Sequence, residues 1–489
     1  MTKISKGNFI NGKWVSAFGG QLFSMSPSDN SVIWDGRLSN ERDLDSAIQA
    51  SNAVLEKWSN LSIDERLVYL NRFVELVGNR KEEIADAISL EVGKPRWESV
   101  TEVDAVIGKL APTIEAYQTR ASTLTRSTGS AKSYTRFLPH GVAVVLSPIN
   151  FPIHMGNGHI MPALLAGNTV IWKPSELCPM VAEMLIELWS DTGIPPGVIN
   201  LVQGKSEAAQ YLIRSKSINA VLFTGSRSAG LAINQALANE PWKIVALEMG
   251  GDSPLVVWDY LEMKSAVFIA IQSAYITSGQ RCSAARRLIV KKNDKEFLNQ
   301  LALTIKRIKV SPPNETPQPY MGPMVSALYA QRLLDAQDKL ISDGAVSIVK
   351  SELLRPNSAL VSPGLIDVTN IRSRDCGEIF GPLLQVITVD TFADAILEAN
   401  RSSYGLAAGL ISRDKRLFEI FLHQVKAGII NWNQQLTGAT SYAPFGGIKE
   451  SGNNRPSGSF AVDYCSYPVA SLEVEEPTFP GSLPPGLSL

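Results

Sequence analysis

From residue 169 onward, short apolar runs alternate regularly with helical patterns, and this alternation constrains the fold more than any other feature. The apolar runs, which have the composition of buried strands, are Thr169–Trp172, Val198–Val202, Ala220–Phe223 and Ile244–Leu247. The helical patterns between them are Val181–Ser190, Ala208–Arg214 and Gly230–Ala238. Strands joined through helices make right-handed crossovers and therefore a parallel sheet. Such a sheet binds ligands beyond the carboxyl ends of its strands, so this part is predicted to be a nucleotide-binding layer.

The flanking segments predict further elements of both kinds. Three short β-type runs come first, at Asn8–Val15, Gln21–Met25 and Val32–Trp34. Helical patterns follow near 41–58, 63–93 and 97–119, and then two strand candidates, Ser133–Phe137 and Val142–Leu146. A second alternation runs through Pro254–Val257, Met263–Thr277, Arg287–Val290 and Lys295–Ile308. The segment Ser311–Pro323 is expected to be a surface connection, and the Pro- and Gly-rich tail after Glu475 is expected to leave the globule.

The composition argues against several classes of function. Lys and Arg together number 46 and Asp and Glu 47, so no concentrated basic surface is expected for nucleic acid or an anionic membrane. No apolar run approaches the ~20 residues of a membrane-spanning helix, and no long apolar stretch follows the N-terminal lysines as in a secretory signal. The four cysteines are widely spaced and the histidines are scattered. We therefore expect reduced thiols in a cytoplasm, with neither a disulfide framework nor a metal site.

Three side chains are candidates for chemistry. Cys282 follows a small-residue turn beside Arg281, whose charge would favour a thiolate; the alternative is a buried structural cysteine. Glu248 ends a predicted strand and precedes a Gly-Gly turn, where it is either a general base or a solvated strand-end carboxylate. Asn150 lies between two prolines that would hold its amide still for a developing oxyanion, unless it is an ordinary turn asparagine.

Two predicted strand ends could hold a nucleotide. In Phe223–Gly230 a strand runs through a glycine turn into a helix, whose first backbone N–H groups attract phosphate. The GxGxxG fingerprint is absent, and only Gly225 and Gly230 frame the turn, so a phosphate loop and a plain βα turn both remain open. At the other strand end, Lys173 could reach a ribose or phosphate and Glu176 could accept hydrogen bonds from ribose hydroxyls, or both belong to a charged loop.

Taken in order, these segments resemble the aldehyde dehydrogenase superfamily. The matching blocks are Pro148–Pro152, Leu165–Glu176, Phe223–Ser226, Leu247–Gly251, Gly279–Cys282, Glu378–Pro382 and Pro444–Gly447. The resemblance implies an α/β fold with a Rossmann-type NAD-binding domain (1–120 and 141–250) and an α/β catalytic domain (251–430). It further implies a small β oligomerisation element with a C-terminal tail (121–140 and 455–489), and therefore a homodimer or a dimer of dimers.

The resemblance also implies a role for each candidate residue. Cys282 would be the nucleophile and Glu248 the base, while Asn150 and the Cys282 backbone N–H would form the oxyanion hole. The residues implied to bind NAD are Lys173 and Glu176 at the ribose, Gly225, Ser226, Arg227, Ser228, Ala229 and Gly230 at the pyrophosphate, and Glu378 and Phe380 at the nicotinamide. Relatives usually carry an aromatic residue at position 149, so Ile149 is expected to change the packing and the pocket shape.

The implied chemistry oxidises an aldehyde to a carboxylate. A thiolate attacks the aldehyde, and the thiohemiacetal loses hydride to become a thioester. Water deprotonated by Glu248 then hydrolyses the thioester. Members that pass the acyl group to coenzyme A need not have this glutamate, so its presence favours water as the acceptor. NAD is favoured over NADP because a carboxylate at Glu176 would repel a 2′-phosphate.

Further segments indicate a polar, acidic substrate. They resemble the branch of the superfamily that oxidises N-succinylglutamate 5-semialdehyde in arginine degradation by the succinyltransferase route. These segments are Asn157–Ile160, Pro162–Asn168, Asn431–Ala439, Ala443–Ile448, Ser451–Asn453, Arg455–Ser457 and Asp463–Cys465. Gly158 stands where the superfamily often has a bulky aromatic residue, which suits a bulky polar substrate. Arg281 and Arg455 either bind its carboxylates or make structural salt bridges.

Three alternative functions remain open. The first is the same oxidation of another acidic semialdehyde, such as succinic or glutamic semialdehyde. The second is a catalytically silent relative with a structural or binding role, against which the retained Cys282, Glu248 and Asn150 argue. The third is a thiol esterase that uses no cofactor, which production of NADH from an aldehyde would exclude.

Overall fold

The computed structural model describes residues 2–129, 131–371 and 377–488. Its first large sheet has the order β12-β11-β8-β9-β10-β2-β3. These strands are β2 (Asn8–Ile10), β3 (Lys13–Val15), β8 (Val142–Leu146), β9 (Thr169–Lys173), β10 (Ile199–Leu201), β11 (Ala220–Thr224) and β12 (Ile244–Glu248). Strands β8 to β12 are all parallel, as predicted, and β2 and β3 add an antiparallel edge. The carboxyl ends of the parallel strands therefore share one edge of the sheet.

Helices cover both faces of this sheet. One face packs against α2 (Ile63–Asn79), α3 (Lys81–Val92), α4 (Arg96–Ile107), α5 (Leu110–Arg120), α6 (His154–Ala166) and α7 (Pro179–Asp191). The other packs against α1 (Glu41–Ser59), α8 (Ser206–Arg214) and α9 (Arg227–Leu237). Successive strand residues alternate between the two cores, so Val145 packs in the first and Val144 in the second. Both faces are buried, which explains why the strands are apolar throughout.

Some predicted boundaries were wrong. The helical pattern at 63–93 is two helices, because Arg80 leaves helical geometry between α2 and α3. The pattern at 97–119 is likewise divided between α4 and α5, at Gly108 and Lys109. The run Asn8–Val15 is a hairpin that turns at Asn11 and Gly12, both with positive φ. Helix α6 was not predicted, because Gly156, Gly158 and Pro162 disfavour a helix that burial nevertheless stabilises.

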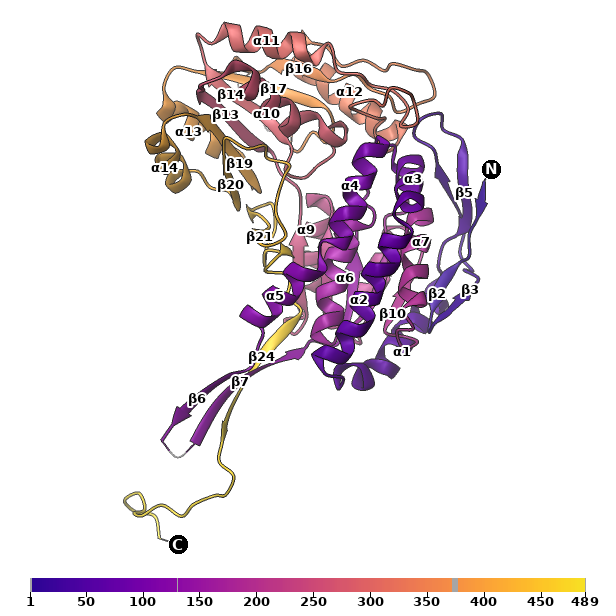
Figure 1. Cartoon of the computed structure of the whole chain (residues 1–489), viewed down its shortest axis with the longest axis vertical. Helices are drawn as coiled ribbons and strands as arrows, with labels where there is room; N and C mark the ends of the chain where they lie inside the picture. The colour runs from indigo at the N-terminus through magenta and orange to yellow at the C-terminus, as the bar shows by residue number, and fades with distance from the viewer. Residues whose placement is uncertain (1, 130, 372–376, 489) are drawn as a thin grey trace.

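A second seven-stranded sheet forms the other half of the molecule, with the order β15-β16-β17-β14-β13-β19-β20 (Figure 1). Its strands are β13 (Ser253–Asp259), β14 (Ala285–Lys291), β15 (Val346–Val349), β16 (Gly364–Asp367), β17 (Leu383–Val389), β19 (Ala407–Ser412) and β20 (Ile429–Trp432). Helices α10 (Met263–Tyr275) and α11 (Lys295–Ile305) cover one face. Helices α12 (Ala327–Ser342), α13 (Phe392–Asn400) and α14 (Lys415–Gln424) cover the other.

A three-stranded antiparallel arm projects from the first half, followed by the C-terminal tail (Figure 1). It consists of β6 (Leu124–Thr128), β7 (Ala131–Pro139) and β24 (Ser466–Glu473). As predicted, the tail after Glu475 is exposed. Smaller sheets are formed by β1 (Lys3–Ile4), β4 (Gln21–Met25) and β5 (Val32–Arg37), by β18 (Tyr404–Gly405) and β22 (Ile448–Lys449), and by β21 (Pro444–Phe445) and β23 (Ser457–Gly458). None of the helices described has the length and apolar character needed to cross a bilayer.

Candidate active site

A cavity of about 750 Å³ lies at the carboxyl edge of the first sheet and extends to elements of the second half. Its lining contains Cys282, Glu248 and Asn150, so the structure brings the three predicted chemical residues to one cavity. The remaining lining residues form two sets. One, around the start of α9 and helix α12, includes Gly225, Ser226, Arg227, Ser228, Glu378, Phe380, Tyr329 and Arg332. The other, around α4, α6 and the C-terminal segments, includes Thr101, Ala105, His154, Met155, Thr437, Gly438, Ser457 and Gly458.

Cys282 and Glu248 both line the cavity, and the Glu248 carboxyl affects the pKa of the Cys282 thiol. Glu248 is 1% exposed, and its Oε1 has no hydrogen-bond partner among the described residues. Burial, and secondarily the charge of Glu378, raises the pKa of Glu248 to about 8. Burial and the nearby Glu248 also raise the pKa of the Cys282 thiol. The resting pair therefore holds its protons, and the carboxylate form of Glu248 is a strong enough base to activate water near neutral pH.

The Asn150 amide is held against the loop that precedes Cys282. Its Nδ2 donates a hydrogen bond of 2.8 Å to the backbone carbonyl of Gln280. The amide NH₂ group has two hydrogens, so one remains for a developing oxyanion beside Cys282. Ile149, the departure from the usual aromatic residue, lines the cavity and packs beside Val92 and Cys178.

The backbone before Cys282 makes a left-handed turn of three residues. Thr277 and Ser278 have φ of 57° and 52°, and Gly279 has φ of 67°. A β-branched residue such as Thr277 rarely adopts this conformation without support from its surroundings. A Cβ on Gly279 would overlap the carbonyl oxygen of Gly381, so that position requires glycine. The turn brings the Cys282 side chain to the end of β12 instead of extending helix α10.

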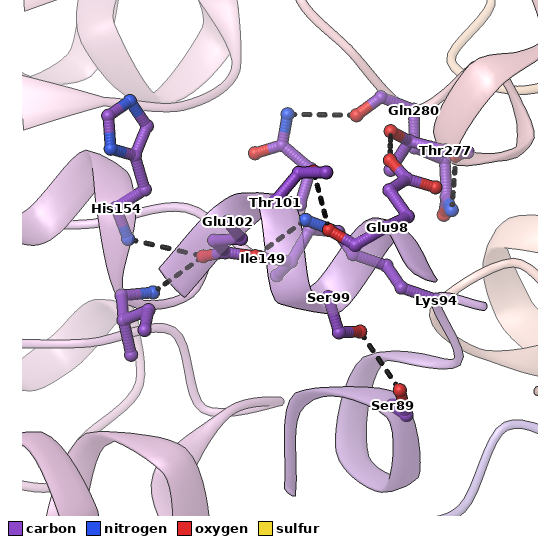
Figure 2. Close-up of polar contacts among 12 residues, drawn as sticks. Ser89, Lys94, Glu98, Ser99, Thr101, Glu102, Ile149, His154, Thr277 and Gln280 are labelled. Atoms are coloured by element: carbon purple, nitrogen blue, oxygen red, sulfur yellow. Dashed lines mark hydrogen bonds and ion pairs between the residues drawn. The ribbon is translucent and has the colours of Figure 1, made fainter. Parts of the chain in front are cut away.

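Helix α4 supports both loops of the site through two carboxylates (Figure 2). Glu98 accepts hydrogen bonds from Thr277 Oγ1 and from Arg281 Nη2, the latter at 2.9 Å. One turn further on, Glu102 accepts the backbone N–H groups of Ile153 and His154, both at 3.1 Å, at the start of α6. Lys94 donates to Glu102 at 2.6 Å and makes this a buried ion pair. The nucleophile loop and the loop of Asn150 are thus both held by one helix.

A buried arginine, which the sequence analysis missed, holds the nucleophile loop from its other side. Arg286 donates hydrogen bonds of 2.5 and 3.0 Å to the backbone carbonyls of Gly279 and Arg281. It also donates to Gly381 O at 3.1 Å and lies 3.5 Å from the carboxylate of Glu378. Two consecutive arginines at the start of an apolar strand were the only sequence signal for this role. Arg286 therefore links the nucleophile to the segment of Glu378 and Phe380.

The start of helix α9 fits a dinucleotide phosphate. Ser226 is the N-cap, and no acidic residue occupies the first turn, so its backbone N–H groups and dipole present positive potential to the cavity. Arg227 donates to Glu450 at 2.6 Å, and its charge is therefore shared with an acid. Side chains at Gly225 and Gly230 would overlap Phe223 and Met249, which explains the two glycines. Ala229 donates its backbone N–H to Ser226 Oγ at 3.3 Å.

The two predicted ribose ligands lie outside the lining of this cavity. Lys173 ends β9 and is buried, and its Nζ donates to the carbonyls of Pro174 and Gly204 at 2.7 and 2.8 Å. Burial lowers the pKa of Lys173. Glu176 follows in the loop after β9 and is partly exposed.

The two predicted substrate arginines are both engaged elsewhere. Arg281 lines the cavity but pairs with Glu98 and donates to Thr437 O at 2.8 Å, which is the structural salt bridge considered as its alternative. Arg455 donates to Gly447 O at 2.6 Å and is not among the cavity-lining residues. Among the described residues, no cluster of His, Cys, Asp and Glu could hold a metal ion.

A thiol, a buried carboxyl and a backbone-anchored amide thus lie in one cavity at the carboxyl edge of a parallel sheet, an arrangement suited to an enzyme. The chain belongs to the aldehyde dehydrogenase family, whose family model matches residues 14–469.

Solved structures are similar over nearly the whole chain. An aldehyde dehydrogenase from Bacillus cereus in complex with NAD+ is 28% identical, with 96% of each chain covered and a TM-score of 0.90. A 1-pyrroline-5-carboxylate dehydrogenase from Thermus with bound NAD is 28% identical, with 96% of this chain and 93% of that chain covered and a TM-score of 0.91. Indole-3-acetaldehyde dehydrogenase with NAD+ is also 28% identical, with coverages of 96% and 97% and a TM-score of 0.92. The chain is an NAD-dependent aldehyde dehydrogenase with the predicted fold.

Proposed function

We propose that this enzyme oxidises N-succinyl-L-glutamate 5-semialdehyde to N-succinyl-L-glutamate, with Cys282 as nucleophile, Glu248 as base and Asn150 as oxyanion donor. The observation that carries these roles is that Cys282, Glu248 and Asn150 line one cavity, with the Glu248 carboxyl buried in it. A nucleophile paired with a base and placed beside an immobilised amide is the arrangement that acyl chemistry requires.

The residues then act in a simple order. Cys282 releases its thiol proton to solvent, and the sulfur bonds to the aldehyde carbon. The second hydrogen of the Asn150 amide and the Cys282 backbone N–H stabilise the resulting oxyanion. Bound NAD would supply the acceptor for the hydride that leaves this carbon, and loss of the hydride leaves a thioester on Cys282. Glu248 then removes a proton from water, which cleaves the thioester and regenerates the thiol.

Cofactor binding is assigned to both halves of the molecule. Residues 1–120 and 141–250 form the NAD-binding part in this proposal, and 251–430 the catalytic part. The N-terminus of α9, residues Gly225 to Gly230, would hold the pyrophosphate. Glu378 and Phe380, which line the cavity, would position the nicotinamide, and Lys173 and Glu176 would hold the ribose.

The proposed oligomeric state and cellular compartment rest on other features of the molecule. The arm of residues 121–140, together with 455–489, is proposed to pair subunits into a dimer or a dimer of dimers, since its strand β6 is an exposed edge. A reactive free thiol at Cys282 favours a reducing cytoplasm as the working compartment.

The choice of an acidic semialdehyde rests on the pattern of segments around residues 157–168 and 431–465, which resembles that branch of the family. It is supported by the cavity volume and by Gly158, where a bulky side chain would narrow the substrate side. The similar Thermus structure is named for 1-pyrroline-5-carboxylate, which also carries a carboxylate.

The assignment is tested by measuring NAD reduction with N-succinylglutamate 5-semialdehyde and with the same aldehyde lacking the succinyl group. We expect the succinylated aldehyde to have the higher kcat/KM, and equal values would reject the specific substrate.

The catalytic roles are tested by two variants. Cys282→Ala should abolish both oxidation and labelling by a thiol reagent at that position. Glu248→Gln should still release about one NADH per Cys282 in a burst, whereas its steady-state rate should fall about 10²–10⁴-fold. An unchanged steady-state rate would remove Glu248 from the role of base.

A further inference from the structure

An unpaired lysine is buried beside the part of the cavity that is lined by α4, α6 and the C-terminal segments, which we call the substrate side. Lys109 lies between α4 and α5 and is only 2% exposed. Among the described residues, none accepts a hydrogen bond from its Nζ and none forms an ion pair with it. Burial lowers the pKa of Lys109 to about 8, and no neighbouring acid opposes this effect. An unpaired buried ammonium destabilises a fold, so its presence close to residues that line a cavity indicates a functional role.

The missing side chain of Gly158 leaves space beside Lys109. A Cβ on Gly158 would meet only two atoms of other elements within 4 Å, Ser457 Oγ at 3.9 Å and Lys109 Cε at 4.0 Å. Ser457 lines the cavity, as do Ala105 on α4 and His154 on α6. The space left by Gly158 therefore lies between the Lys109 side chain and the hydroxyl of Ser457, a residue that lines the cavity.

The histidines near Lys109 carry no compensating charge. Burial, followed by the charge of Lys109, lowers the pKa of both His154 and His159 to about 3, so both are neutral. Both ring nitrogens of His159 already have hydrogen-bond partners, Tyr464 Oη at 2.9 Å and Thr224 Oγ1 at 3.1 Å. Neither ring can neutralise an ammonium group.

The arginines that line the cavity are either paired with an acid or lie away from Lys109. Arg281 pairs with Glu98, and Arg227 pairs with Glu450. Arg332 is exposed on α12 beside Tyr329, in the set of lining residues around the start of α9 and helix α12. Lys109 is therefore the cation best placed to meet a negative group on the substrate side.

We propose that Lys109, with the hydroxyl of Ser457, binds a carboxylate of the substrate in the space left by Gly158. This inference rests on the proposed oxidation of an acidic aldehyde and deepens it. The aldehyde carbon is held at Cys282 and the distant carboxylate at Lys109, so the distance between the two sites selects the length of the substrate. The charge-assisted hydrogen bond formed on binding supplies the partner that the ammonium lacks in the free enzyme.

The test compares each acidic semialdehyde with its methyl ester, in which the carboxylate charge is absent. The measured quantity is the ratio of kcat/KM for the acid to that for the ester, with NAD at saturation. In Lys109→Met this ratio should fall about 10- to 100-fold through an increase in KM for the acid, as expected for the loss of one charge-assisted contact. Lys109→Arg should retain part of the preference. Lys216→Met removes an exposed lysine outside the cavity lining and is the matched control.

Gly158→Leu provides a second route if Lys109→Met folds poorly. Its side chain would fill the space between Lys109 and Ser457, and it should also lower the acid-to-ester ratio. Unchanged ratios in both variants would overturn the proposal. If the wild type prefers another acidic semialdehyde, N-succinylglutamate 5-semialdehyde is rejected as the substrate. The acid-to-ester ratio of kcat/KM measured with the preferred aldehyde then still decides the role of Lys109.

Discussion

At the residue scale, the site depends on side chains whose tertiary contacts could not be predicted from the sequence. Cys282, Glu248 and Asn150 could be selected because each stands beside turn-forming residues and matches a family block. The partners of Arg281 could not be predicted, because Glu98 lies far away in the sequence and meets it only through the packing of α4. Arg286 was missed for the same reason, since its acceptors are backbone carbonyls of two separate loops.

The raised pKa of Glu248 predicts a pH-dependent rate. Burial raises this pKa to about 8, and only the deprotonated carboxylate can accept a proton from water. Steady-state turnover at saturating aldehyde and NAD should therefore increase from pH 6.5, reach half its maximum near pH 8 and level off above about pH 9. Glu248→Gln should lack this increase. A wild-type profile that is flat from pH 6 to 9 would contradict hydrolysis through this group.

At the element scale, regular alternation predicted most strands and helices of both large sheets. Prediction failed where tertiary contacts outweigh local preference. Helix α6 contains two glycines and a proline, yet nearly all of it is buried and Glu102 accepts the N–H groups at its start. Of the two glycines, Gly158 leaves a space beside Lys109 and Ser457 that a larger residue would fill.

Helix α4 should control the reactivity of Cys282, which it does not touch. Glu98→Gln weakens the contacts to Thr277 and Arg281 that hold the left-handed turn. We expect the free energy of unfolding to fall by about 3 kcal/mol, the lower range for breaking a buried ion pair. Labelling of Cys282 by iodoacetamide should slow as well.

Glu115→Gln, an exposed change on α5, is the control for this variant and should alter stability by less than about 0.5 kcal/mol. Normal labelling of Cys282 in a destabilised Glu98→Gln protein would show that α4 supports the fold but not the nucleophile.

At the scale of the whole molecule, the balance of buried ionisable groups should set how stability varies with pH. Burial raises the pKa of Glu91 and Glu378 to about 7 and that of Glu248 to about 8. Between pH 6.5 and 8 the unfolded chain has already released these protons, while the folded chain still holds part of them. Folding therefore binds protons in this window, and stability falls as the pH rises.

This dependence should appear in thermal unfolding of the full chain. From pH 6.5 to 8 each of the three carboxyls should lower the free energy of unfolding by on the order of 1 kcal/mol. Glu91→Gln, which lies outside the catalytic cavity, should reduce the slope by about one such contribution. A Tm that rises across this interval would show that these carboxyls are ionised in the native state.

The strand that ends in Glu248 is completed by residues from near the end of the chain. Asn453 exchanges hydrogen bonds with Leu247, and Ser451 accepts the backbone N–H of Met249. During synthesis the ribosome must therefore translate some two hundred further codons before the base has its final backbone support. A nascent chain can assemble the nucleotide-binding sheet early, but it can become a competent catalyst only when its last tenth has emerged and folded back.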